Sequence, residues 1–196
     1  IGYRVKPGII VYGAFVIDEL SWQDIMSDWW GNKYSYQIGL FVTSSNMSLP
    51  DLRVEYNVTR PWTYTHPDFS YTHREKVLGS PYGPSSKAIR IESFYFPRPK
   101  IIIESSFEHV LMGMGNGANV LDNYDNRNED LDWDTKFFLD DKQKFSELNI
   151  SFNYILSDLL RLRSTFSISE TFNPYFFSES QKYREEKFIL GLEFKW

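Results

Sequence analysis

The chain has 196 residues, a formal net charge of −5 and no cysteine. The negative charge argues against a nucleic-acid-binding surface, and the absence of cysteine excludes a disulfide framework, a cysteine-ligated metal and a cysteine nucleophile. Aromatic residues make up 18% of the sequence, too many for a disordered chain. The longest apolar run, residues 9–17, is too short for a transmembrane helix, which needs about 20 residues.

A single domain over residues 1–196 is expected from this length. The sequence starts at Ile1 rather than at a methionine, and no secretory signal pattern follows. We therefore expect the C-terminal part of a longer, processed protein.

Apolar and polar side chains alternate along most of the sequence, which is the period of a β-strand. In residues 52–59, for example, Leu52 and Val54 alternate with Arg53 and Glu55. The pattern predicts eight strands, over residues 8–17, 34–44, 51–59, 86–96, 100–112, 143–156, 159–170 and 183–196. Several exceed the usual length of about 5–6 residues and suit strands that cross a bilayer, which need about 9–11 residues.

The connections between these strands alternate in length. The long ones are residues 18–33, 60–85, 113–142 and 171–182, and the short ones are residues 45–50, 97–99 and 157–158. Transmembrane barrels have short periplasmic turns at one end and long external loops at the other. The alternation also places the C-terminus at the end of the short turns.

Charged residues fall in the middle of the predicted strands, where a charge facing lipid would cost about 2–4 kcal/mol for Arg or Lys. They are Arg53, Glu55, Arg90, Glu92, Glu104, Glu108, Glu147, Arg161, Arg163 and Glu193. Facing a wet lumen, opposite charges on neighbouring strands can pair. We therefore predict an all-β, antiparallel transmembrane up-and-down β-barrel, whose eight strands here are part of a larger barrel. The alternative is a soluble β-sandwich with its polar face in water.

The last strand ends in a motif that resembles the C-terminal assembly signal of bacterial outer-membrane barrels. Gly191 is followed by the aromatic residues Phe194 and Trp196, the last residue of the chain. The resemblance implies outer-membrane lipid and the barrel assembly machinery as partners.

A longer motif reads EYNVTRPWTYTH and then YTHREKVLGSPYGPSS. It resembles the Wzi-like family of capsule-assembly outer-membrane proteins, through Glu55, Tyr56, Pro61, Tyr64, Thr65, His66, Tyr71, Thr72, His73, Leu78, Gly79 and Gly83. Upstream, residues 18–20 (DEL) resemble the acidic strand end of that family. Family members are larger barrels, and the resemblance implies a bacterial outer-membrane protein that binds capsular polysaccharide at its outer face without catalysis.

Candidate polysaccharide contacts lie in the first two long loops. They are Arg60, Trp62, Tyr64, His66, Tyr71, His73, Arg74 and Trp22. Aromatic rings suit the CH-rich faces of sugars, and Arg suits acidic sugar groups. In the alternative, the loop of residues 60–85 folds inward as a plug in which the histidines make buried hydrogen bonds. Trp29 and Trp30 are interpreted as an aromatic girdle at the membrane interface.

No metal or cofactor is expected. The acidic loop of residues 113–142 lacks the glycine and glutamate of a calcium-binding loop and is interpreted as solvated, with residues 113–117 as a flexible start. A hydrolase would have to use His109 with Ser105 or Ser106, but His109 falls on an apolar face, so we predict no enzyme. The other functions considered are a porin-like channel and a structural subunit of a larger outer-membrane complex.

Overall fold

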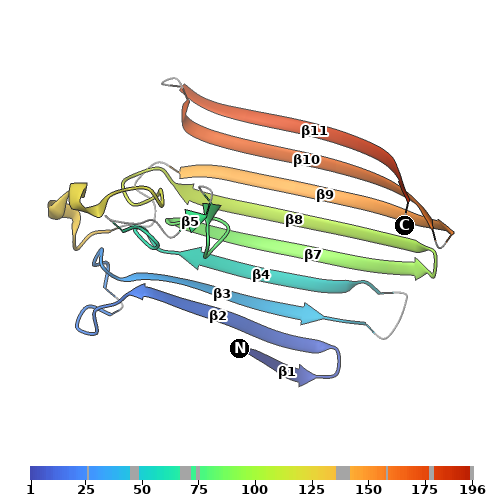
Figure 1. Cartoon of the computed structure of the whole chain (residues 1–196), viewed down its shortest axis with the longest axis horizontal. Coiled ribbons are helices and arrows are strands. Elements are labelled where there is room, and N and C mark those ends of the chain that lie inside the picture. The colour runs from blue at the N-terminus through green and yellow to red at the C-terminus, as the bar shows by residue number, and fades with distance from the viewer. Residues whose placement is uncertain are drawn as a thin grey trace.

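The computed structural model describes residues 1–25, 27–44, 49–66, 72–73, 76–135, 142–157, 159–176 and 179–194. Within them, nine strands form one antiparallel sheet in the order of the chain (Figure 1): β1 Gly2–Lys6, β2 Ile9–Glu19, β3 Lys33–Val42, β4 Asp51–Thr59, β7 Ser86–Arg98, β8 Ile101–Gly113, β9 Lys142–Ser157, β10 Leu160–Phe176 and β11 Glu179–Phe194. A separate pair, β5 Thr72–His73 and β6 Lys76–Val77, lies between β4 and β7 in the sequence. The edges of the large sheet are β1 and β11.

The prediction of an all-β, antiparallel fold is confirmed, and all eight predicted strands are present. The prediction missed β1, which pairs with β2 through a turn at Pro7 and Gly8. Gly8 has a φ of 82°, a conformation that glycine adopts without steric cost. The turn between two short alternating segments is therefore a signal that could have predicted β1.

The predicted long connection over residues 171–182 is wrong. There, β10 continues to Phe176 and β11 begins at Glu179, so the two strands form a long hairpin. Pro174 falls within this range, and a proline argues against the interior of a strand. Pro174 lies where the pairing register shifts between Asn173 and Phe176, and such irregular positions tolerate a proline within a sheet.

The strand register assigns the residues to two faces, because directly paired residues of antiparallel strands share a face. The pairing runs from Glu55 to Arg90, Glu108 and Glu147 across β4, β7, β8 and β9. This polar face also carries Tyr12, Gln37, Arg53, Asn57, Glu92, Ser106, Asn149, Ser151, Asn153, Arg163, Thr165 and Glu193.

The opposite, apolar face is exposed along the sheet. It carries Val11, Phe15, Ile17, Ile38, Leu40, Leu52, Tyr56, Ile89, Phe107, Leu148, Ile150, Phe152, Phe166, Leu190 and Leu192, all of them exposed. Charges join this face near the hairpin that connects β10 and β11, where Glu170 lies 2.9 Å from Lys182 and Arg184 lies 2.7 Å from Glu186. Nothing in the described part of the chain covers the apolar face.

Charged side chains of the polar face pair with one another, as the alternation of signs predicted. The carboxylate of Glu92 lies 2.9 Å from Arg53 and 2.7 Å from Arg90. Towards the other edge of the sheet, Arg163 lies 3.3 Å from Glu193. Arg53–Glu92 and Arg163–Glu193 join neighbouring strands, and Arg90–Glu92 lies within β7, so these charges are compensated within the sheet.

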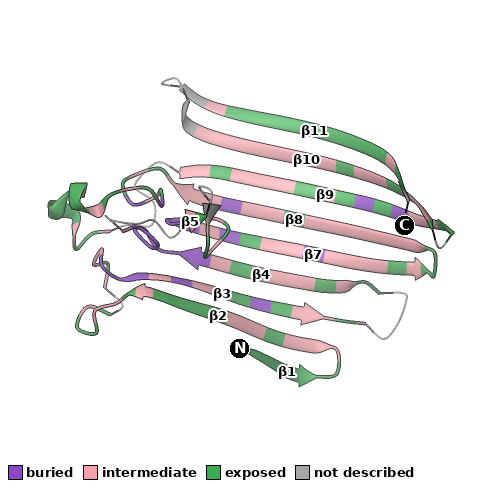
Figure 2. Cartoon of the chain, in the orientation of Figure 1, coloured by how far each residue is buried: buried purple, intermediate pink, exposed green. Residues whose placement is uncertain are grey.

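Most buried residues gather at one end of the sheet, whereas the buried polar residues Glu92, Ser151 and Asn153 lie away from it (Figure 2). The buried apolar side chains are Val58, Trp62, Tyr64, Ala88, Val110 and Val120, from the ends of β4, β7 and β8 and from the loops beside them. The core therefore lies where the long loops meet the strand ends. No helix in the described ranges is long and apolar enough to cross a membrane.

Candidate functional site

Three long loops meet at the same end of the sheet, which we call the loop end (Figure 1). They connect β2 to β3, β4 to β7, and β8 to β9. In a meander of antiparallel strands, every second connection returns to the same end. The opposite end, the turn end, carries short connections, among them residues 99–100 between β7 and β8, whereas the short connection between β10 and β11 lies at the loop end.

The segment of residues 60–66 has a strained backbone that its surroundings hold in place. Trp62 and Tyr64 have positive φ values of 64° and 71°, a conformation that costs a non-glycine residue about 1–3 kcal/mol. The Trp62 N–H donates to the Gly117 carbonyl (2.8 Å), and the Tyr64 N–H donates to Asp18 Oδ2 (2.8 Å). Tertiary contacts with two other parts of the chain therefore fix this segment.

Asp18, near the end of β2, binds this segment through both carboxylate oxygens. Oδ2 accepts from Tyr64, and Oδ1 lies 3.2 Å from Nε2 of His66. The acidic strand end noted in the sequence thus has a structural partner, the segment of residues 60–66.

Lys33 joins the first and third long loops. Its side chain is fully buried, and its ammonium lies 4.7 Å from the ring centre of Trp30 and 4.2 Å from that of Tyr124. Glu19 supplies the countercharge at 2.8 Å. A desolvated cation between two aromatic rings is worth about 2 kcal/mol or more, so this contact holds the two loops together.

Arg127 makes a second cation contact with the ring of Trp30. Its guanidinium carbon lies 4.2 Å from the centre of Trp30, and Nε donates to Asp132 at 2.8 Å. The hydrogen bond to Asp132 raises the pKa of Arg127 above its ordinary value. The third loop is therefore folded around its own ion pair and against the first loop.

The structure separates the predicted polysaccharide contacts into buried and exposed residues. Arg60, Trp62 and Tyr64 are only 4%, 5% and 3% exposed, which agrees with the alternative in which the loop folds inward. His66 is half-buried against Asp18, whereas His73 and Trp22 are exposed. Tyr71, Arg74 and Trp196 lie outside the described residues. Gly191 lies within β11, and Phe194 is its last residue.

The tryptophans of the first loop differ in their surroundings. Trp29 and Trp30 pack against each other, with ring centres 5.9 Å apart, and Trp30 packs edge-on to Trp62 at 6.4 Å. Trp30 is thus part of the loop packing, in contrast to the interpretation as a girdle around the apolar face. Trp22 and Trp133, 80% and 65% exposed, present aromatic surface at the loop end.

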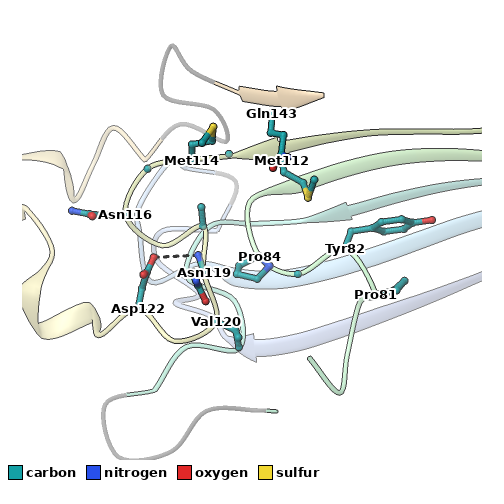
Figure 3. A pocket seen from close by; sticks show the side chains of 14 residues that line it. Pro81, Tyr82, Pro84, Met112, Met114, Asn116, Asn119, Val120, Asp122 and Gln143 are labelled. Atoms are coloured by element: carbon teal, nitrogen blue, oxygen red, sulfur yellow. Dashed lines mark hydrogen bonds between the residues drawn. The ribbon is translucent and has the colours of Figure 1, made fainter. Parts of the chain in front are cut away.

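A cavity of about 970 Å³ opens at the loop end (Figure 3). Its lining comes from residues 81–84, from residues 112–122 and from the start of β9: Pro81, Tyr82, Gly83, Pro84, Met112, Gly113, Met114, Gly115, Asn116, Ala118, Asn119, Val120, Asp122 and Gln143. The volume lies at the upper end of the range of about 300–1,000 Å³ for small-molecule pockets. The cavity can therefore hold a ligand of several ring units.

Tyr82 connects this cavity to the polar face of the sheet. Its hydroxyl donates to Glu108 Oε1 at 2.7 Å. Burial and this hydrogen bond to a carboxylate raise the pKa of the Tyr82 phenol above its ordinary value, so the ring presents a neutral hydroxyl at neutral pH.

Sequence reasoning missed the cavity because it interpreted residues 113–117 as a flexible loop start. In the structure, Asp122 Oδ2 accepts from the backbone N–H groups of Gly117 (2.8 Å) and Asn119 (3.1 Å). Gly117 has a φ of 80° and lies so close under the Trp62 ring that a Cβ would clash. At Gly117 the absence of a side chain permits the close approach of the backbone to the Trp62 ring.

Neither a metal centre nor a catalytic triad is assembled in the described part of the chain. No group of three or more His, Asp or Glu side chains there could hold a metal ion. His109 lies 2.8 Å from Ser146 rather than bonding Ser105 or Ser106. In the strand register Ser146 lies between His109 on β8 and Glu170 on β10. Glu170, Ser146 and His109 therefore lack the acid–histidine–serine order of a hydrolase.

Comparison with known proteins found no similarity: no family model, no curated protein and no solved structure matches this chain.

Proposed function

We propose that this chain is an outer-membrane β-barrel protein of the Wzi-like type, which holds surface polysaccharide at its loop end and catalyses no reaction. The observation that carries the proposal is the uncovered apolar face of the large sheet, with apolar side chains exposed on β2, β3, β4, β7, β8, β9, β10 and β11. A soluble monomer rarely exposes a contiguous apolar patch larger than a few hundred Å². Such a face is suited to contact with the acyl chains of lipid.

The distribution of charge along the apolar face supports this proposal. On β10 and β11 the face is mainly apolar from the turn end up to Ile168 and Phe188, with Ser164 as the polar exception. Beyond these residues it becomes charged, at Glu186, Glu170, Arg184 and Lys182. Leu160 to Ile168 spans nine positions of β10, within the about 9–11 residues with which a tilted strand crosses a bilayer. The charged stretch would then lie at the level of the lipid headgroups, on the external side.

The polysaccharide would contact the exposed parts of the loop end. Trp22 and Trp133 offer ring faces to sugar, whereas the predicted contacts Trp62 and Tyr64 are buried and would support the loops from below. In this proposal Gly191, Phe194 and Trp196 belong to the signal read by the barrel assembly machinery. The Wzi-like assignment rests on the motif of residues 55–83.

The membrane part of the proposal is tested by the need for detergent or lipid. The chain is expected to refold only when lipid vesicles or detergent are present, to float with vesicles in a density gradient, and to resist alkaline extraction. A monodisperse, folded monomer in plain buffer would overturn the proposal.

The polysaccharide part is tested with the refolded chain in nanodiscs and a panel of acidic and uncharged capsular polysaccharides, with binding measured by biolayer interferometry. The double variant Trp22→Ala, Trp133→Ala should bind at least about fivefold more weakly, since two stacking contacts of about 0.5–1.5 kcal/mol each are lost. The matched control is Leu159→Ala, which removes an equally exposed apolar side chain at the turn end. Absence of binding to every polysaccharide would contradict this part.

The charged polar face is the observation that favours a second candidate function, a porin-like channel. The same nanodisc preparation, fused into planar bilayers, distinguishes the two. Steady open conductance would favour the channel, and a closed protein would favour the binding role.

A further inference from the structure

The walls of the cavity at the loop end are held in a fixed shape by hydrogen bonds. On one side, Ser86 Oγ donates to the Gly83 carbonyl at 2.7 Å, and the Gly113 N–H donates to the Ser85 carbonyl at 2.8 Å. On the other side, Asp122 accepts from the backbone of Gly117 and Asn119, as Figure 3 shows for Asn119. A ligand would therefore meet a preorganised site, which lowers the entropic cost of binding.

The lining offers uncharged hydrogen-bonding groups beside apolar surfaces. Asn116, Asn119 and Gln143 carry side-chain amides, each of which can donate and accept. A sugar hydroxyl also donates and accepts, so amides can pair with it in either sense. Pro81, Pro84, Met112 and Met114 provide apolar surfaces, which suit the CH groups of a pyranose ring.

The charge around the cavity disfavours an anionic ligand. The lining residues named above include no Lys, Arg or His, and one acid, Asp122. Residues 113–135, which form one wall and its continuation, carry six carboxylates and a single cation, Arg127. Arg127 is engaged by Asp132 and by the ring of Trp30. Lys142, the register partner of Gly113, adds a second cation beside the lining. The carboxylates still outnumber these two cations, and a net negative field repels a polyanion at low salt.

We propose that this cavity binds an uncharged segment of the polysaccharide, two or more neutral hexose units, and discriminates against uronate-containing chains. The inference rests on the proposed function, since it names the class of ligand taken at the same loop end. The exposed tryptophans would contact the polymer outside the cavity, and the amides would read its hydroxyls inside.

The test uses the full chain in nanodiscs with two probes of equal length, maltohexaose and hexagalacturonate, and measures affinity by isothermal titration calorimetry at 20 and 200 mM salt. Maltohexaose is expected to bind at least about tenfold more tightly at low salt. Any residual uronate binding should strengthen as salt rises, because added salt screens the repulsion.

Two variants connect the binding to the cavity. Ala118→Trp fills the space, and Asn116→Leu replaces an exposed amide by an apolar group of similar size. Each should weaken maltohexaose binding at least about fivefold, whereas Asn149→Leu on the polar face, away from the cavity, should not. Circular dichroism in nanodiscs verifies that each variant is folded.

The outcomes separate this inference from the proposed function. Tighter binding of hexagalacturonate, or maltohexaose binding that neither cavity variant changes, would overturn the inference and leave a polysaccharide-binding loop end intact. Failure of both probes and of every polymer in the panel would overturn both.

Discussion

The two faces of the sheet differ in whether their side chains find partners within the sheet. On the polar face, Arg53 and Arg90 both lie within 3 Å of Glu92, and Tyr12 donates to Glu55. On the apolar face, side chains such as Ile150 have neighbours only along their own face and remain exposed. One face is completed by its own groups, and the other requires something outside the described chain.

This difference shows where the stability of the molecule must come from. A soluble β-sandwich buries its apolar face against a second layer about 10 Å away. Here the buried core is confined to the loop end, around Val58, Trp62 and Val110. The sheet away from that end depends on its hydrogen-bond ladder, on the pairs of the polar face and on the medium that contacts the apolar face. Charges placed on the two faces should therefore have unequal costs.

The largest effect is expected from a charge in the middle of the apolar face. Ile150→Arg should destabilise the chain in lipid by about 2–4 kcal/mol, because an arginine facing the bilayer midplane loses its hydration. The neighbouring variant Asn149→Arg, on the polar face, should cost much less, since position 149 lines a polar hollow of about 350 Å³ with the carboxylates of Glu92 and Glu104. Denaturant unfolding in lipid vesicles, monitored by tryptophan fluorescence, measures both free energies of unfolding.

An equal cost for the two arginine variants would break the comparison, since it would mean that both faces contact the same medium. A cost of Ile150→Arg that stays the same when vesicles are replaced by plain buffer would equally contradict the assignment of lipid to the apolar face.

A smaller effect is expected within the polar face from Glu92→Gln. The carboxylate serves two guanidinium groups, and its loss leaves both short of a charged acceptor. We expect a destabilisation of about 1–3 kcal/mol. The matched control, Glu193→Gln, breaks the Arg163–Glu193 pair, in which both side chains are nearly half exposed, and should cost at most about 1 kcal/mol. Unfolding midpoints measured in the same vesicles compare the two.

A double-mutant cycle of Glu92→Gln with Arg53→Gln sharpens this measurement, because it isolates the coupling between the two side chains. A coupling energy close to zero would show that the Arg53–Glu92 contact adds nothing to stability and that the polar face is stabilised by its backbone hydrogen bonds.

The fold was predictable from the sequence to the extent that it depends on local alternation. The period of two placed the faces of β4 and β9 correctly, because each residue's face follows from its neighbours in the chain. It failed at β1 and along residues 171–176, where a short strand and a proline weaken the periodic signal. Strand existence is a local property, whereas the length of a hairpin depends on how far the pairing with the partner strand continues.

The loop end was far less predictable, because its contacts join residues distant in the sequence. Lys33 is held by Tyr124, and Trp62 lies on Gly117. Sequence patterns correctly singled out residues 60–66 as unusual, but the aromatic and basic residues there suggested exposed ligand contacts. In the structure the same residues are buried, since tryptophan and tyrosine serve loop packing as well as they serve sugar stacking. Composition alone does not separate these roles.

The smallest effect is expected in the pH dependence of stability and involves Tyr82, which connects the loop end to the polar face of the sheet. Burial, followed by the hydrogen bond to Glu108, raises the pKa of its phenol above the ordinary value of about 10. At high pH the unfolded chain loses the Tyr82 proton more readily than the folded chain, because the pKa is higher in the folded state. The stabilisation by the protonated Tyr82 is therefore fully present below about pH 10 and is lost as the pH rises further. Unfolding midpoints between about pH 9 and 12 should therefore fall less steeply in Tyr82→Phe than in the parent chain. Glu108→Gln, which removes the charged acceptor but leaves the burial, should give an intermediate slope. Identical slopes in all three proteins would mean that the tyrosine at the cavity wall is not coupled to the polar face, and that the loop end and the sheet respond to pH independently.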